Sequence, residues 1–315
     1  MNAHTDFRAV AAGSYDIPAE VYHADPAPEP SLSSTLARQL LGASPLHAWA
    51  KSPRLNPEHV SEDKDAFNLG RAAHTSILGK GQPFTASGFD NFRTKAAREE
   101  REDLEAKGFT VLNPEQFTNL AMMTGAARFQ MERHGIGDVF TRGQIERSHF
   151  AQIDGVWCRC MTDCLIEDGQ IVYDYKTTAG SAAPDAVIRT ICNYGYDVQA
   201  AHYLDVVKAV MGGDWRFRLI VQEKSDPFAL SVVEIGADWL ITARKKAARA
   251  RELWRLCLDR YGESPWPGYP AQVAVLSEPT WHESKWLDRE AFEAGYRETH
   301  GQDVLAAGMA WQAPV

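Results

Sequence analysis

The segment IVYDYKTT, residues 171–178, decides the fold because it combines the composition of a buried strand with two charges. Its β-branched and aromatic residues are typical of a β-strand. Asp174 and Lys176 are two positions apart, and side chains alternate along a strand, so both point to the same face. A neighbouring group must explain why a carboxylate and an ammonium share that face.

The residues before this segment predict a hairpin that supplies such a group. Residues 156–166, VWCRCMTDCLI, also have the pattern of a strand. Asp168 and Gly169 between the two runs favour a two-residue turn, because both positions tolerate the left-handed conformation. This turn places Asp163 directly opposite Asp174. A three-residue loop would instead shift the register and put the two aspartates on opposite faces.

Two carboxylates in cross-strand positions, with Cβ atoms about 5 Å apart, repel each other unless something neutralises them. A divalent cation is the simplest neutraliser, and hard oxygen ligands suit Mg²⁺ or Mn²⁺. Such an ion polarises a phosphoryl oxygen, and Lys176 adds a positive donor beside it. The alternative is an ordinary ion-pair ladder on the protein surface, which contributes little to stability.

The wider pattern predicts an α/β (α+β) fold in which helices flank a central mixed β-sheet. Residues 1–30 form an N-terminal arm that contains the proline-rich DPAPEP. Ser33 or Ser34 is a natural N-cap for the first helix, which begins a helical N-terminal elaboration. We expect strands at 147–154, 156–166, 171–178 and 215–224, and helices at 35–41, 65–78, 197–211 and 237–261.

Composition limits the classes of function. The net charge of -9 argues against a protein that coats nucleic acid through bulk electrostatics,. Basic stretches at 93–101 and 244–255 are local, and solvated helix faces explain them equally well. No apolar run approaches the roughly 20 residues of a membrane span, and the N-terminus lacks the pattern of a secretion signal. We therefore expect a cytoplasmic protein without a membrane partner.

The order DCLI, turn, IVYDYKTT resembles the D…(D/E)xK signature of the PD-(D/E)xK nuclease superfamily, with aspartate at the second acidic position. Further motifs resemble its RecB-type branch, and the layout most resembles the RecE-like phage exonucleases of the exonuclease VIII type. This resemblance implies one nuclease domain over residues 31–315, with a catalytic core at about 65–260. The further motifs are SLSS (31–34) with Ser44-Pro45, LGRAAHTSIL (69–78) and Gln199-x-x-x-Tyr203.

The resemblance also implies a set of site residues. Lys176 would position the attacking water next to the two aspartates. Glu146 matches a position where related nucleases hold metal or water, although an ordinary exposed glutamate is an equally good interpretation. The implied ligands of Mg²⁺ or Mn²⁺ are His74, Asp163, Asp174 and the backbone carbonyl of Tyr175. The implied DNA-binding residues are Gln199, Tyr203, Ser33 and Ser34.

The resemblance implies a metal-dependent exonuclease that degrades double-stranded DNA from its ends, 5′ to 3′. The 3′ overhang would serve a RecT-type annealing partner, and a homo-oligomeric ring would thread the duplex along residues 244–255. A RecB-type nuclease with another polarity, or with a preference for single strands or flaps, is one alternative. A catalytically silent DNA-end-binding protein on the same fold is another.

The cysteines set this chain apart from RecB-type nucleases that hold an iron–sulfur cluster. Those proteins use one upstream cysteine and three near the end of the nuclease domain. Here Cys158, Cys160 and Cys164 are expected on one strand face opposite the acids, and Cys257 stands alone. We therefore expect buried apolar cysteines and no iron–sulfur cluster.

Overall fold

The computed structural model describes residues 10–59 and 68–303. The chain divides into two compact units, Met1–Gly268 and Tyr269–Val315. The second unit contains helix α11 (Thr280–His300), in which no residue is buried. The predicted domain limits at residues 30, 31 and 315 stay predictions. All of the candidate site lies in the first unit.

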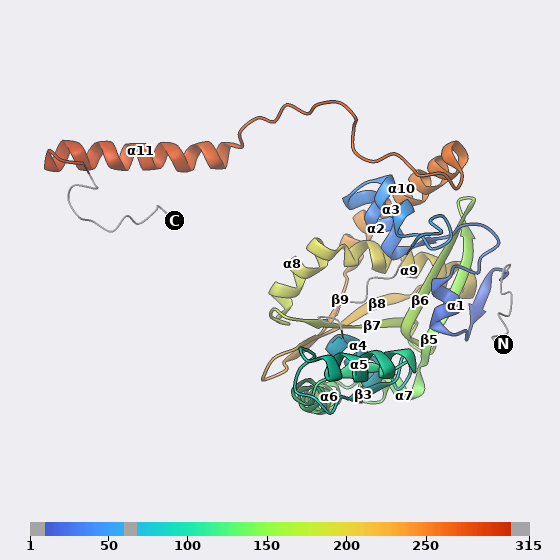
Figure 1. Ribbon diagram of the computed structural model, residues 1–315. Helices are drawn as coiled ribbons and strands as arrows, with labels where there is room; N and C mark the ends of the chain where they lie inside the picture. Colours follow the sequence, from blue (N-terminus) through green and yellow to red (C-terminus); the bar gives the residue numbers. More distant parts are fainter. Residues whose placement is uncertain (1–9, 60–67, 304–315) are drawn as a thin grey trace. The chain divides into compact units, whose positions relative to one another are not determined.

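In the described residues, a seven-stranded mixed sheet forms the centre of the first unit (Figure 1). Its order is β1-β5-β6-β7-β8-β9, and β2 pairs with β6 off this path. The pairs β7–β8 and β2–β6 are parallel, and the remaining pairs are antiparallel. The strands are β1 (Gly13–Tyr15), β2 (Leu32–Ser33), β5 (Gln144–Ile153), β6 (Val156–Ile166), β7 (Ile171–Thr178), β8 (Arg216–Glu223) and β9 (Leu230–Glu234).

Helices cover both faces of this sheet, which confirms the predicted fold class (Figure 1). One face carries α2 (Ser34–Gly42), α3 (Pro45–Ala50), α8 (Pro184–Tyr194), α9 (Tyr196–Met211) and α10 (Ala237–Tyr261). The other face carries α4 (Asn68–Leu78), α5 (Lys95–Ala106), α6 (Pro114–Arg133) and α7 (Val139–Arg142), together with a small sheet of β3 (Phe84–Ala86) and β4 (Thr110–Leu112). A short helix, α1 (Ala19–His23), follows β1.

The two faces of the sheet bury separate hydrophobic clusters. The α9-side cluster includes Leu36, Val172, Tyr203, Leu219 and Trp254. The α6-side cluster includes Ala73, Met123, Ile171, Tyr173, Tyr175 and Ile220. Successive residues of β7 therefore enter opposite clusters, and apolar burial on both faces explains why IVYDYKTT is a nearly continuous apolar run.

The hairpin has the predicted register. Cys164 pairs with Tyr173 and Leu165 with Val172, so the next positions in the same register bring Asp163 opposite Asp174. The reason given for the turn was wrong, however. The left-handed residue is Gln170, at φ 50°, rather than either of the two central turn residues, and its N–H donates to the carbonyl of Glu167 at 3.0 Å.

The placement of the cysteines corrects one prediction. Cys158 and Cys160 lie in the α9-side cluster, whereas Cys164 lies in the α6-side cluster, so the three do not share a face. The face to which β6 side chains point changes between Cys160 and Cys164. Asp163 lies in this stretch, and Glu146 opposite it on β5 has a left-handed backbone at φ 48° and interrupts the pairing of β5 with β6. All three cysteines are free and buried.

Helix predictions largely agree with the structure. The hydroxyl of Ser33 accepts from the Leu36 N–H at 3.3 Å and caps α2, as expected. Helix α10 has the predicted bounds, and α9 begins one residue earlier than predicted. Residues 65–67 of the predicted second helix lie outside the described residues. Strand β9 and the bounds of the long helix α6 were not predicted.

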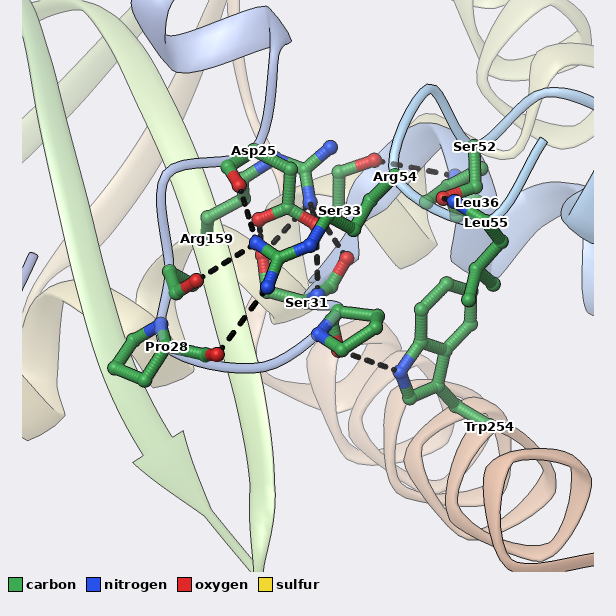
Figure 2. A network of polar contacts seen from close by, with 12 residues as sticks. Asp25, Pro28, Ser31, Ser33, Leu36, Ser52, Arg54, Leu55, Arg159 and Trp254 are labelled. Atoms are coloured by element: carbon green, nitrogen blue, oxygen red, sulfur yellow. Dashed lines mark hydrogen bonds and ion pairs between the residues drawn. The ribbon is translucent and has the colours of Figure 1, made fainter. Parts of the chain in front are cut away.

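A buried ion pair fastens the residues before β2 to the sheet (Figure 2). Arg159 on β6 is 4% exposed, and its Nη1 lies 2.9 Å from a carboxylate oxygen of Asp25. The same nitrogen donates to the carbonyl of Ser31 at 2.6 Å. Arg54 donates to the carbonyls of Asp25 and Ala27, and Trp254 donates to that of Pro30. These contacts fix the start of β2 and α2.

Candidate active site

The candidate active site lies where the hairpin of β6 and β7 meets helices from both faces of the sheet. Helix α4 is held at the site by its packing in the α6-side cluster, and helix α9 by its packing in the α9-side cluster. The polar side chains that converge are His74 from α4, Glu146 from β5, Asp163 from β6, Asp174 and Lys176 from β7, and Gln199 from α9.

His74 and Asp163 form an ion pair at one side of the site. Nε2 of His74 lies 3.2 Å from Oδ2 of Asp163, and that oxygen also accepts the backbone N–H of Tyr175 at 2.8 Å. Burial opposes the charge on both groups, but their mutual attraction outweighs it. The pKa of His74 is therefore raised and the pKa of Asp163 lowered,.

Glu146 lies on the Nδ1 side of the His74 ring. Its Oε1 is 3.9 Å from Nδ1 of His74, beyond hydrogen-bond distance,. The residue is 7% exposed, and burial raises the pKa of its carboxyl despite the nearby charges of His74 and Lys80. Glu146 is thus a buried carboxyl at the edge of the site rather than an ordinary exposed glutamate.

Asp174 is the most deeply buried carboxylate of the site, at 1% exposure. Its Oδ1 accepts from Nε2 of Gln199 at 2.8 Å, and its Oδ2 lies 2.5 Å from Nζ of Lys176. Burial raises the pKa of Asp174 to about 6 even with the lysine beside it. For Lys176, burial opposes the charge, but the attraction of Asp174 outweighs it and raises the pKa.

A cavity of about 620 Å³ opens beside these residues. Lys176 borders it, together with the cations Arg71 and Lys224, so the cavity suits an anionic ligand,. The ammonium of Lys176 lies 5.6 Å from the ring centroid of Tyr196, a cation–π distance,. The other lining residues are Gly70, His74, Tyr175, Thr177, Thr178, Ala179, Thr190, Tyr194 and Val221.

The predicted substrate-binding residues are only partly brought together. Gln199 lies against Asp174, as described above. Tyr203 is buried in the α9-side cluster with its ring 6.0 Å from that of Phe217. Ser33 caps α2, and Ser34 is a buried residue of its first turn. Tyr203, Ser33 and Ser34 do not border the cavity.

Tyr175 presents its backbone and its side chain to different sides. Its N–H contacts Asp163, while its side chain enters the α6-side cluster, where the hydroxyl donates to Gln222 at 2.5 Å. This agrees with the prediction that the side chain points away from the acids.

Sequence reasoning missed four residues that line the cavity, namely Arg71, Tyr194, Tyr196 and Lys224. The Tyr-Gly-Tyr sequence between two helices was the available signal for the two tyrosines.

The donor set has the chemistry of a hard divalent cation site. Oδ2 of Asp174 is buried and its partner is already a cation, the Lys176 ammonium at 2.5 Å, and carboxylate oxygens are the ligands that Mg²⁺ and Mn²⁺ prefer,. In residues 10–59 and 68–303, no three His, Cys, Asp or Glu side chains are arranged closely enough to hold a metal. Instead, Lys176 and His74 supply the counter-charges to the two aspartates.

Residues 33–273 match the family described as PDDEXK-like domain of unknown function (DUF3799). The chain belongs to this family. The PDDEXK-like chain also has the fold of a solved protein from Eubacterium rectale described as "Putative exonuclease", with a TM-score of 0.56 and 16% identity over 84% of this chain and 96% of that one. A phage related exonuclease from Haemophilus somnus 129PT is similar at a TM-score of 0.28 and 8% identity, over 62% of this chain and 84% of that one.

No curated protein matches this PDDEXK-like chain. Within the part of the chain that the structure describes, no helix is both long and apolar enough to cross a membrane.

Proposed function

We propose that this PDDEXK-like protein is a divalent-metal-dependent exodeoxyribonuclease that hydrolyses phosphodiester bonds at the ends of double-stranded DNA. The observation that carries the proposal is the convergence of Asp163, Asp174 and Lys176 beside a cavity with a cationic lining. The family match supports it, because the two aspartates and the lysine stand in the D…(D/E)xK order.

His74, Asp163, Asp174 and the Tyr175 carbonyl would hold Mg²⁺ or Mn²⁺, with Glu146 available for a second ion. A bound ion supplies positive charge to the phosphoryl oxygens. Other side chains of the protein would orient the ligands of this ion. Gln199 fixes the orientation of the Asp174 carboxylate by donating to Oδ1.

Lys176 is the residue that we propose acts on the reacting phosphate. Its raised pKa keeps it protonated near neutral pH, so it donates rather than accepts protons. A fixed ammonium at this position stabilises charge that develops on the phosphate, or orients the attacking water through a hydrogen bond. Its contacts with Asp174 and the Tyr196 ring hold it in place before substrate arrives.

Three finer features rest on the resemblance to RecE-like exonucleases. These are 5′-to-3′ digestion in the cytoplasm, a 3′ overhang for a RecT-type annealing partner, and a homo-oligomeric ring. A ring would confine positive charge to a channel, which suits a chain of net charge -9,. Lys246, Arg249 and Arg251 of α10 already pair with carboxylates of the chain, so residues 244–255 bring less charge to a channel than their sequence indicates.

The test is digestion of linear duplex DNA, labelled at the 5′ or the 3′ end, by the wild type and by Lys176→Ala in Mg²⁺. We expect release from the 5′ label, no cleavage of closed circular duplex, and a loss of about 100-fold or more in the variant. Lys208→Ala is the matched control, because Lys208 is a surface lysine that pairs with Asp214. Absence of metal-dependent release from either end would refute the proposal.

A further inference from the structure

Two tyrosines, one exposed and one partly buried, lie at the border of the candidate site. Helix α8 ends at Tyr194 and α9 begins at Tyr196, with only Gly195 between them. The two rings are stacked, with centroids 5.7 Å apart and planes at 24°. Tyr194 is 63% exposed, and both residues border the cavity that contains Lys176. Tyr196 packs against the α9-side cluster, whereas the exposed ring of Tyr194 contributes little to a core, so its position calls for another explanation.

Arg38 supports this pair at the junction of the two helices. Arg38 of α2 donates from Nη1 to the carbonyl of Tyr194 at 2.9 Å, and its guanidinium carbon lies 5.9 Å from the Tyr196 centroid. Gly195 is left-handed at φ 66°, and a Cβ there would lie 3.1 Å from Cδ of Arg38. The helix junction is thus built around the arginine, which holds the backbone at Tyr194 and lies over the ring of Tyr196.

The pair also contacts the proposed catalytic machinery directly. Lys176 lies against the ring of Tyr196, so the ammonium and the aromatic pair occupy neighbouring positions on one side of the cavity. Proteins that bind single-stranded DNA combine these two elements, because cations hold the phosphates while aromatic rings stack on the bases. Tyr194 supplies the exposed ring, and Tyr196 supports it from behind.

We propose that Tyr194 and Tyr196 form a stacking platform for an unpaired nucleobase of the DNA strand whose phosphate lies at Lys176. This inference rests on the proposed function, which supplies the DNA substrate. An unpaired base has an open π-face, whereas a base inside a duplex is already stacked on both sides. The platform therefore favours frayed or single-stranded ends, and it tolerates any of the four bases.

The test measures binding without cleavage. A short single-stranded DNA oligonucleotide carries 2-aminopurine, whose fluorescence falls when it stacks on an aromatic ring, and the buffer contains EDTA. We expect quenching with the wild type. For Tyr194→Ala, we expect loss of the quenching and about 5- to 30-fold weaker binding by fluorescence anisotropy. Tyr194→Phe keeps the ring and retains both properties.

Tyr261→Ala is the matched control, because Tyr261 is a partly exposed tyrosine at the end of α10 and is not among the residues that line the cavity. Wild-type quenching and affinity in Tyr194→Ala would overturn the platform. Equal weakening for a fully paired blunt end would overturn it as well, because the ring would then not select unpaired bases.

The two proposals fail separately. If the wild type digests linear duplex in Mg²⁺ while Tyr194→Ala binds and quenches normally, the platform is wrong and the nuclease stands. If the wild type quenches the probe through Tyr194 but cleaves no DNA with any divalent metal, the platform stands and the nuclease is wrong.

Discussion

Replacing Asp174 with asparagine should make the metal-free protein more stable while removing the proposed activity. The carboxylate is 1% exposed, and burial raises its pKa from 3.8 to about 6. The folded protein therefore holds the neutral form of this group more readily than the unfolded chain does. The asparagine side chain would resemble that neutral form and keep an oxygen that can accept from Gln199.

The raised pKa sets the size of the effect. A change from 3.8 to about 6, at about 1.4 kcal/mol for each pH unit, corresponds to roughly 3 kcal/mol at neutral pH. The attraction of Lys176 is already part of that pKa, but the amide nitrogen of asparagine would face the Lys176 ammonium, which lies 2.5 Å from Oδ2 of Asp174, and two donors in contact offset part of this gain. We therefore expect Asp174→Asn to raise the free energy of unfolding by about 1–3 kcal/mol at pH 8. Exchange of activity for stability is common at functional sites.

The sign of the pH dependence follows from linkage. Because the folded pKa is raised, the stability that protonation of Asp174 contributes is fully present below pH 3.8 and is lost as the pH rises through about 6,. The asparagine variant does not lose it. The advantage of the variant is therefore small near pH 4 and reaches its full value above about pH 7.

Urea denaturation in EDTA, at pH 4.5 and pH 8, measures both values. Asp214→Asn is the control, because Asp214 is exposed and its pKa is lowered by the hydrogen bond and charge of Lys208, so this substitution should not stabilise. Added Mg²⁺ should stabilise the wild type and not Asp174→Asn. An Asp174→Asn variant that unfolds at the same or a lower urea concentration than the wild type at pH 8 would contradict a raised pKa of Asp174.

Further substitutions test the contacts that hold the elements around the site. Gly195→Ala places alanine in the left-handed helical region, at φ 66° and ψ 36°, which costs about 1–2 kcal/mol,. Gly212→Ala places it at φ 71° and ψ -166°, a conformation essentially confined to glycine, which costs about 1–3 kcal/mol,. Only Gly195→Ala should also weaken single-stranded DNA binding, because its Cβ meets Arg38 while that of Gly212 meets nothing within 4 Å. Arg159→Met should cost about 3–5 kcal/mol, because it leaves buried Asp25 without its ion pair,. Urea denaturation should show most of this loss restored by adding Asp25→Asn, and no restoration would contradict that cause.

The parts of the site that sequence could predict are those set by local geometry. The alternation of β7 and the short connection to β6 were enough to place Asp163 opposite Asp174. The register is as predicted, but the left-handed residue of the turn is Gln170 and not Asp168 or Gly169. Register depended on the number of residues in the connection more than on which of them turned.

Features set by packing between distant elements could not be predicted from the residues alone. Gln199 and Tyr203 share a helix face, yet one reaches Asp174 while the other, a turn later, meets Phe217 in the core. The phase change in β6 that separates Cys160 from Cys164 lies opposite a strained residue on another strand, Glu146. No pattern within the segment 156–166 reveals it.

The site draws its side chains from both layers of helices, and this has a consequence for how the protein becomes active. His74 reaches Asp163 only when α4 has packed into the α6-side cluster, and Gln199 reaches Asp174 only when α9 has packed into the α9-side cluster. A partly folded chain with one cluster formed holds only part of the set. The proposed active site is therefore complete only when both clusters have formed, so a chain with one cluster formed would lack the proposed activity.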